Sequence, residues 1–204
     1  MTACVILAGG RSSRMGGEDK CFLPLKGEPL LAHVMARIAP QTSAILINSN
    51  GEPAKFHGFG VPVARDRTEG FQGPLSGLLT GMIWARESHA ATHVLSVPCD
   101  TPFLPSDLVR RLEKAMRQTG AEIAIARDEE RSHPVIGLWP VALAGRLAAD
   151  LADGTRAIHR WLAQFHVCEV PFSARHFHNI NTRAELREAG SRTTVTAYSQ
   201  HEGT

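Results

Sequence analysis

Residues 4–20 read CVILAGGRSSRMGGEDK, an apolar run that stops at a glycine-rich, basic segment. Every position from 4 to 8 is apolar, which is typical of a strand buried on both faces of a parallel sheet. Four glycines within residues 9–17 allow the backbone to turn with its N–H groups exposed. A loop of this kind can hold anionic oxygens, so this stretch predicts an α/β fold with a ligand at the end of its first strand.

The rest of the chain alternates between short apolar runs and segments with helical spacing. We expect strands at residues 44–47, 60–64, 92–97, 122–126, 135–139 and 167–170. We expect helices at residues 29–39, 75–87, 106–118 (with Ser106 as N-cap), 141–151, 157–165 and 182–188. The alternation predicts a single α/β domain with a mostly parallel twisted sheet and helices on both faces. The domain should span residues 1–189, and the polar residues 190–204 should form a mobile tail.

Composition limits the class of protein. The chain has 204 residues, of which 43% are hydrophobic and 21% charged, as in a globular domain that folds without disulfides. Its net charge of +2 argues against broad nucleic-acid binding. The four cysteines form no CxxC motif, and the N-terminal apolar run is too short to be a signal or a membrane span. We therefore expect a reduced, cytoplasmic protein with no nucleic-acid or membrane partner.

The glycine-rich loop carries positive charge from Arg11, Arg14 and Lys20, which suits a polyphosphate. Neither the Walker A spacing nor the Gly-x-Gly-x-x-Gly fingerprint of dinucleotide-binding proteins is present. Asp19 is expected to pair with Arg14 or Lys20 and to hold the shape of the loop. The alternative is a surface loop that happens to be basic.

Polar residues follow three further strands. Asn48, Asp66 and Asp100 come directly after expected strands, and ligands of open α/β sheets bind beyond the carboxyl ends of the strands. Asn and Asp also end strands for purely structural reasons, so their convergence is the stronger signal. Asp100 lies between two prolines, a rigid mount for a hard cation such as Mg²⁺, although a turn or cap role is the alternative.

Three other segments are candidates for contacts with a substrate. The segment Gly73, Pro74, Leu75, Ser76, Gly77 precedes a helix, and its glycines could allow close backbone approach by a sugar or base, or the segment could be a plain helix start. His133 precedes Pro134 at the opening of a strand and could line a second substrate pocket, whereas the other histidines read as scattered structural residues. Asn179 and Asn181 would point the same way in an extended stretch and could read a heterocycle edge, or could form a turn.

No Ser-His-Asp or Cys-His arrangement stands out. A phosphate monoester is already mostly ionised at neutral pH and needs no side-chain base to attack another phosphate. Such a reaction needs positioning, charge neutralisation and a metal ion.

The ordered set of motifs resembles the MobA-type nucleotidyltransferases, the molybdenum cofactor guanylyltransferases. The resemblance runs from about residue 3 to 189. Its motifs are the loop at 7–20, Gly-Pro-Leu-Ser-Gly at 73–77, Pro-Cys-Asp-Thr-Pro at 98–102, His-Pro at 133–134 and Asn-Ile-Asn-Thr at 179–182.

The resemblance implies a Rossmann-like nucleotidyltransferase fold. It implies transfer of GMP from GTP to the phosphate of molybdenum-molybdopterin, with release of pyrophosphate. It implies catalytic roles for Arg14, Lys20 and Asp100, with Asp100 as the Mg²⁺ ligand. The implied nucleotide contacts are Leu7, Ala8, Gly9, Gly10, Lys20, Asn48, Asp66, Gly73, Pro74, Leu75 and Asp100. The implied pterin contacts are His133, Arg156, Asn179 and Asn181. Molybdopterin-synthesis proteins and molybdoenzyme chaperones are the partners to expect.

Three alternatives stay open at this point. The chain could be a cytidylyltransferase for the same pterin, a sugar-phosphate nucleotidyltransferase, or a non-enzymatic pterin carrier. The sequence does not reveal which groups select guanine or how many copies assemble.

Overall fold

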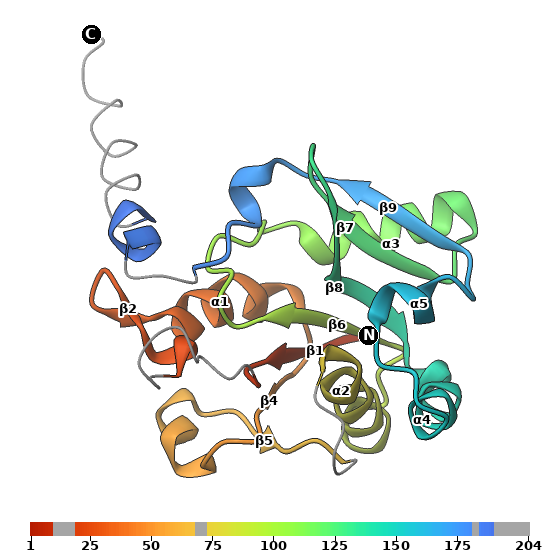
Figure 1. Ribbon diagram of the computed structural model, residues 1–204, viewed down its shortest axis with the longest axis horizontal. Helices are drawn as coiled ribbons and strands as arrows, with labels where there is room; N and C mark the ends of the chain where they lie inside the picture. The colour runs from red at the N-terminus through yellow and green to blue at the C-terminus, as the bar shows by residue number, and fades with distance from the viewer. Residues whose placement is uncertain (10–18, 68–72, 181–183, 190–204) are drawn as a thin grey trace, which may run out of the picture.

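Strand β1 (Thr2–Leu7) is buried from Thr2 to Ile6, because it lies inside a sheet that is covered on both faces. The computed structural model describes residues 1–9, 19–67, 73–180 and 184–189. In it, β1 belongs to a seven-stranded sheet of order β5-β4-β1-β6-β8-β7-β9 (Figure 1). The other strands of this sheet are β4 (Ile45–Asn48), β5 (Val63–Ala64), β6 (His93–Pro98), β7 (Ile123–Arg127), β8 (Ser132–Pro140) and β9 (Val167–Pro171). A separate antiparallel pair joins β2 (Pro24–Leu25) and β3 (Glu28–Pro29).

Strand β8 runs against both of its neighbours, whereas the other pairings of this sheet are parallel. The start of β8 therefore lies at the same edge as the carboxyl ends of β1, β4, β6, β7 and β9. All the candidate residues that flank these strands are brought to that one edge.

Helices cover both faces of the sheet because its side chains alternate between two cores. Cys4 and Ile6 of β1 pack on the side of α1 and α3, and Ala3 and Val5 pack on the side of α2, α4 and α5. The α-helices are α1 (Leu30–Ile38), α2 (Pro74–His89), α3 (Leu108–Thr119), α4 (Ala144–Ala152) and α5 (Ile158–Leu162). The 3-10 helices are η1 (Lys20–Phe22), η2 (Ala39–Gln41), η3 (Pro53–Phe59), η4 (Val141–Leu143) and η5 (Ala174–His176), and residues 184–189 are also helical.

These observations confirm the predicted fold class, a mostly parallel α/β sheet between two helical layers. The expected N-cap at Ser106 is wrong. Helix α3 begins at Leu108 with Asp107 as its N-cap residue, no side chain caps it, and the Asp107 carboxylate pairs with Arg110 at 2.9 Å instead. The strand expected at 60–64 is shortened to Val63–Ala64. The expected tail at 190–204 lies outside the described residues.

A bulge in β8 is stabilised by a buried chain of hydrogen bonds. The register between β7 and β8 shifts between Ile125 and Ala126, where Ile125 pairs with Gly137 but Ala126 pairs with His133. Trp139 donates from its ring N–H to the Ser96 hydroxyl at 2.8 Å, and Ser96 donates in turn to the Val135 carbonyl at 2.6 Å. The Ser96 side chain thereby satisfies a carbonyl within the bulge.

All four cysteines are free, and Cys4, Cys21 and Cys99 are buried. No helix within the described ranges is long and apolar enough to cross a membrane.

Candidate functional site

The ends of β1, β4 and β6 are joined by backbone hydrogen bonds at the carboxyl edge of the sheet. The Ala8 amide donates to the Asn48 carbonyl at 2.8 Å, and the Cys99 amide donates to the Leu7 carbonyl at 3.2 Å. Gly9 is exposed beyond them, with open space where a Cβ would lie. The backbone that leads into the glycine-rich loop is therefore fixed by two neighbouring strands.

Asn48 and Asp66, predicted separately as ligand contacts, are bonded to each other. The buried Asn48 amide donates to Asp66 Oδ1 at 3.0 Å and to the Ala64 carbonyl at 3.2 Å. Asn50 donates to Asp66 Oδ2 at 2.8 Å and accepts from the Asp66 amide at 2.9 Å. The Asp66 carboxylate is thus held by two asparagines, and Asn50 is a member of the network that the sequence analysis did not single out.

Asp100 faces Lys20 across the same edge. Asp100 Oδ2 lies 3.6 Å from Lys20 Nζ, and the two side chains come from segments eighty residues apart. Among the described residues, Asp100 Oδ1 is the one buried side-chain oxygen or nitrogen without a hydrogen-bond partner. Burial raises the pKa of Asp100 above its usual value, and Lys20 opposes that rise.

An unpartnered buried carboxylate oxygen is a suitable ligand for a hard cation. No group of three or more His, Cys, Asp or Glu side chains that could hold a metal gathers in the part of the chain that the structure describes. The site therefore fits an ion that takes one protein carboxylate and completes its shell with substrate oxygens and water, as Mg²⁺ does.

Helix α2 packs closely against this edge, with the side chains of Asn48 and Leu7 directly against Gly77. A Cβ on Gly77 would collide with the Asn48 side chain and would lie 2.6 Å from Leu7 Cδ2. Gly77 is therefore required for close packing between helix and sheet, which differs from the expectation that it leaves room for a ligand. Leu75 is buried in the core on the side of α2, α4 and α5, which does not support the ligand contact expected of it.

The Asn179 segment is fastened to the Asp100 segment. The Ile180 amide donates to the Asp100 carbonyl at 2.9 Å, and the buried Thr101 hydroxyl donates to Asn179 Oδ1 at 2.7 Å. Asn179 thus contacts Thr101, the sequence neighbour of the aspartate that faces Lys20.

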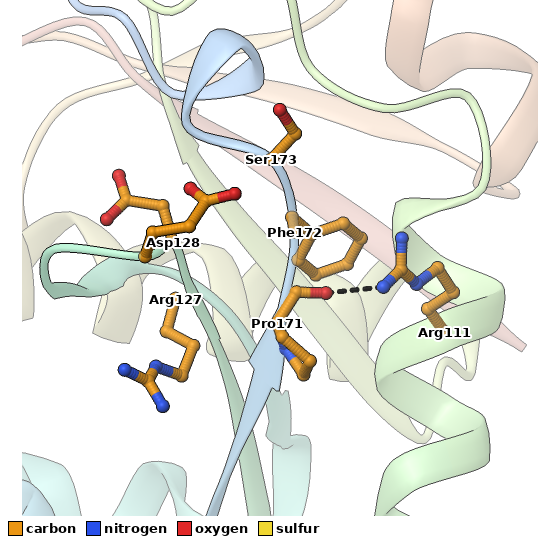
Figure 2. Close-up of a pocket in the computed structure, with 7 residues that line it drawn as sticks. Arg111, Arg127, Asp128, Pro171, Phe172 and Ser173 are labelled. Atoms are coloured by element: carbon orange, nitrogen blue, oxygen red, sulfur yellow. Dashed lines mark hydrogen bonds between the residues drawn. The ribbon is translucent and has the colours of Figure 1, made fainter.

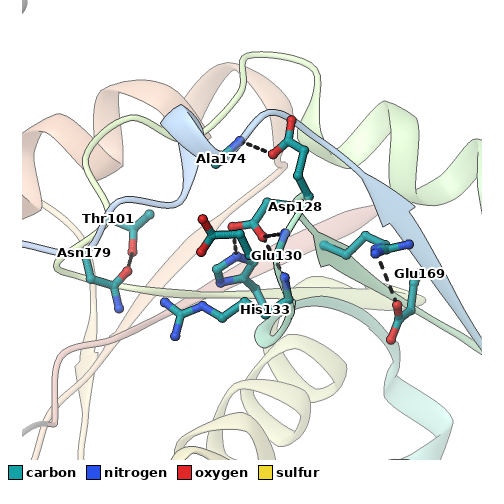
Figure 3. Close-up of polar contacts among 10 residues, drawn as sticks. Thr101, Asp128, Glu130, His133, Glu169, Ala174 and Asn179 are labelled. Carbon is teal, nitrogen blue, oxygen red and sulfur yellow. Dashed lines mark hydrogen bonds and ion pairs between the residues drawn. The ribbon is translucent and has the colours of Figure 1, made fainter.

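His133 lies at the same edge because β8 begins there. Its Nε2 is 2.7 Å from Asp128 Oδ2, and its ring packs on Phe177 at 4.6 Å between centroids. Figure 3 shows Thr101, Asn179, Asp128 and His133 along this edge. Thr101 and Asp128 are partners that the sequence analysis missed, although Asp128 belongs to the charged stretch before His133.

Arg156 lies on the other side of the site. Its guanidinium donates to the Leu151 carbonyl at 2.8 Å and to the Thr155 carbonyl at 2.9 Å, at the end of α4. The Arg156 carbonyl is 3.9 Å from the position of a Cβ on Gly73. The structure therefore places Arg156 near the start of α2.

A pocket of about 410 Å³ lies beyond the ends of β7 and β9. Figure 2 shows Arg111 of α3 beside Phe172, with its guanidinium bonded to the Pro171 carbonyl, and Arg127 and Asp128 on the opposite wall. Among the described residues, those predicted from sequence as ligand contacts do not line it.

The structure thus brings together most of the described candidates. The carboxyl edge of the sheet near β1, β4, β5 and β6 carries Lys20, Asp100, Asn48, Asp66 and residues 7–9. His133 and Asn179 lie farther along the same edge. Gly10, Arg14 and Asn181 lie outside the described residues. Asp19 pairs with Lys55 at 3.1 Å, a contact that the sequence did not indicate.

Comparison with known proteins agrees with this geometry. Residues 4–169 match the family described as "MobA-like NTP transferase domain". The molybdenum cofactor guanylyltransferase of Rhodopseudomonas palustris (strain BisB5) is 46% identical over 193 residues, which cover 92% of each chain. That of Cupriavidus necator is 45% identical over 189 residues, which cover 90% of this chain and 93% of the relative.

Among solved structures, molybdopterin-guanine dinucleotide biosynthesis protein A from Archaeoglobus fulgidus superposes with a TM-score of 0.75 at 20% identity. The superposition covers 96% of this chain and 100% of that one. At this level of identity the likeness shows a shared fold.

Proposed function

Because the chain belongs to the MobA-like NTP transferase family and is therefore a nucleotidyltransferase, we propose that it transfers GMP from GTP to the terminal phosphate of molybdenum-molybdopterin. Pyrophosphate is the second product. The observation that carries the proposal is the facing pair of Lys20 and Asp100 beside the end of β1, with one Asp100 oxygen that no described residue hydrogen-bonds.

The nucleotide is held by the half of the edge formed by β1, β4, β5 and β6. The backbone of residues 7–9 approaches the nucleotide, and Asn48 fixes the Asp66 carboxylate for contact with it. Gly10 and Arg14 extend this surface in the proposal. Gly73 and Pro74 close it from the start of α2.

The chain neutralises phosphate charge with Lys20 and orients the attacking group. Lys20 places its ammonium near the phosphates, where developing negative charge is stabilised by a donor already in place. Asp100 would hold Mg²⁺, which when bound supplies further positive charge to the phosphate oxygens. No side-chain base is required, since the attacking phosphate is already ionised at neutral pH.

The acceptor occupies the half of the edge near β8 and the 177–180 segment. His133 and Asn179 contact the pterin in this proposal, together with Asn181, and Arg156 would approach the pterin from the start of α2. The short path from Asn179 through Thr101 to Asp100 brings the acceptor phosphate toward the nucleotide. We further propose that the enzyme works in the cytoplasm and meets molybdopterin-synthesis proteins and molybdoenzyme chaperones.

The test is an assay of nucleotide choice. Purified protein, Mg²⁺ and molybdenum-loaded molybdopterin are incubated with GTP or CTP, and pyrophosphate and the dinucleotide product are measured. Guanine dinucleotide formed from GTP supports the proposal. Preference for CTP would indicate a cytidylyltransferase. Turnover of a sugar phosphate in place of the pterin would indicate a sugar-phosphate nucleotidyltransferase. Pyrophosphate at the background level would indicate a non-enzymatic pterin carrier.

A further inference from the structure

Asp128 is a buried carboxylate whose two oxygens are both engaged. Its Oδ1 accepts from the Glu130 amide at 2.9 Å and from the Arg131 amide at 2.8 Å, which closes the turn between β7 and β8. Its Oδ2 faces His133 Nε2 at 2.7 Å. These hydrogen bonds, led by that of His133, lower the pKa of Asp128 to about 2. Asp128 is thus an anion at neutral pH, and an ionised carboxylate can only accept hydrogen bonds.

The contact with Asp128 decides which nitrogen of His133 carries the proton. Because the carboxylate can only accept, Nε2 must carry the hydrogen, so that in the singly protonated ring Nδ1 is left as an acceptor. No described residue forms a hydrogen bond with Nδ1, and the His133 side chain is 11% exposed. The Phe177 ring supports the imidazole from the side at 4.6 Å. The ring is therefore fixed in place and in tautomer.

The Asn179 amide is oriented in the same way by its neighbour. The Thr101 hydroxyl donates to Asn179 Oδ1 at 2.7 Å, so that the Nδ2 hydrogens are left to donate elsewhere. Phe177, which contacts His133, is only two residues from Asn179. Figure 3 shows the two bonded pairs along the same edge.

We propose that Asp128 is a positioning residue for the acceptor substrate, because it fixes His133 with Nδ1 as a hydrogen-bond acceptor. Thr101 in turn orients the Asn179 amide so that its Nδ2 is the donor. One donor and one acceptor complement a heterocycle that carries a ring N–H beside a carbonyl. The amide edge of a pterin has this pattern, so the inference rests on the function proposed above and deepens it. Asp128 acts through His133 and does not touch the substrate.

The deciding variant is Asp128→Asn. The asparagine Oδ1 can still accept from the amides of residues 130 and 131, so the turn is kept, and its Nδ2 then donates to His133 Nε2. The proton of His133 must move to Nδ1, which becomes a donor. Glu129→Gln is the matched control: it removes one charge from the same turn, keeps an oxygen to accept from the Ala174 amide at 3.0 Å, and leaves His133 alone.

The first readout is the tautomer in the ligand-free protein, measured by ¹⁵N NMR of histidine-labelled protein. The His133 signals are assigned by their loss in His133→Gln. We expect protonated Nε2 in the wild type and in Glu129→Gln, and protonated Nδ1 in Asp128→Asn. Protonated Nδ1 in the wild type would overturn the proposal, whether or not any variant folds.

The second readout is kinetic. Asp128→Asn should raise KM for molybdenum-molybdopterin about tenfold, the equivalent of about 1.4 kcal/mol, with kcat and GTP binding little changed. Glu129→Gln should match the wild type. An unchanged KM in Asp128→Asn would overturn the inference even if its tautomer has switched. A wild type that makes no guanine dinucleotide would instead count against the proposed function, and the NMR result would still decide the role of Asp128 toward His133.

Discussion

Two aspartates at the same sheet edge have pKa values that are shifted in opposite directions. Burial raises the pKa of Asp100, whereas hydrogen bonds from His133 and two backbone amides lower that of Asp128. Asp100 keeps an unpartnered oxygen, and Asp128 uses both of its oxygens within the protein. The first therefore suits a cation from solution, and the second suits a fixed structural anion.

Lys20 should matter to turnover far more than other lysines do. We expect Lys20→Ala to lower the rate of GMP transfer roughly 10²–10³-fold, the scale of losing one preorganised donor in better-studied sites. Lys114→Ala, on the exposed face of α3, should leave the rate unchanged and serves as the control. Steady-state release of pyrophosphate measures both, and near-normal turnover of Lys20→Ala would remove this residue from the mechanism.

Asp128 should also contribute to stability in a pH-dependent way. Its pKa is lowered from 3.8 to about 2 in the folded protein, so its charged form stabilises the fold above pH ~4, and this contribution is lost as the pH falls toward 2. Asp128→Asn removes the group that titrates. The difference in Tm between wild type and Asp128→Asn should therefore be largest near pH 7 and should shrink at pH 3. A constant difference would contradict the assignment.

The hydrogen-bond and ion-pair partners of the candidate site residues were harder to predict than the candidate residues themselves. Lys20, Asp100, Asn48 and Asp66 could be named because each follows a strand or a glycine-rich loop. Their pairings depend on which strands are neighbours, and sequence spacing does not encode that. Asn50 and Asp128 were missed for the same reason, since their partners lie across a loop and a turn.

At the scale of elements, the bulge in β8 determines where His133 lies. The bulge is maintained by one buried hydroxyl, that of Ser96, which bonds both the Val135 carbonyl and the Trp139 ring N–H. Removal of this hydroxyl would leave a buried donor and acceptor without their partner.

Ser96→Ala should therefore lower the free energy of unfolding by about 1–3 kcal/mol, the cost of leaving buried polar groups unsatisfied. Chemical denaturation measures the loss. Ser106→Ala is the matched control and should change stability by less than about 0.5 kcal/mol, because Ser106 is exposed and does not cap α3. Equal losses in the two variants would contradict the role given to Ser96.

Most elements were predictable because apolar periodicity reports burial. The bounds of α1 and β6 agree with the expected ranges to within about a residue. The cap of α3 was not predictable, since Ser106 and Asp107 are both good N-cap types and the choice depends on tertiary packing. The direction of β8 was not predictable either, because the apolar pattern of a buried strand is the same whether the strand runs parallel or antiparallel to its neighbours.

At the scale of the whole molecule, the proposed function divides the sheet into a nucleotide half and an acceptor half. Strands β5, β4, β1 and β6 run parallel and form the first half, and β8, β7 and β9 form the second. Nucleotide binding should then be measurable without the pterin.

GTP with Mg²⁺ should raise the Tm of the protein in the absence of the acceptor. Ligand at 100 times its Kd stabilises the folded state by about 2.7 kcal/mol. CTP at the same concentration should give a smaller shift, and Lys20→Ala should reduce the shift with GTP. Thermal unfolding followed by circular dichroism measures this, and equal shifts with the two nucleotides would contradict a guanine-selective site.

The reversed direction of β8 has a consequence for how such enzymes diversify. It places the turn at 128–131 at the same edge as the segment 171–180, and in the proposed function these two segments meet the second substrate while the loops of the parallel strands hold the nucleotide. Exchanging these two segments with those of a relative that modifies a different molecule should therefore change which acceptor the enzyme uses. The site that binds the triphosphate should stay as it is.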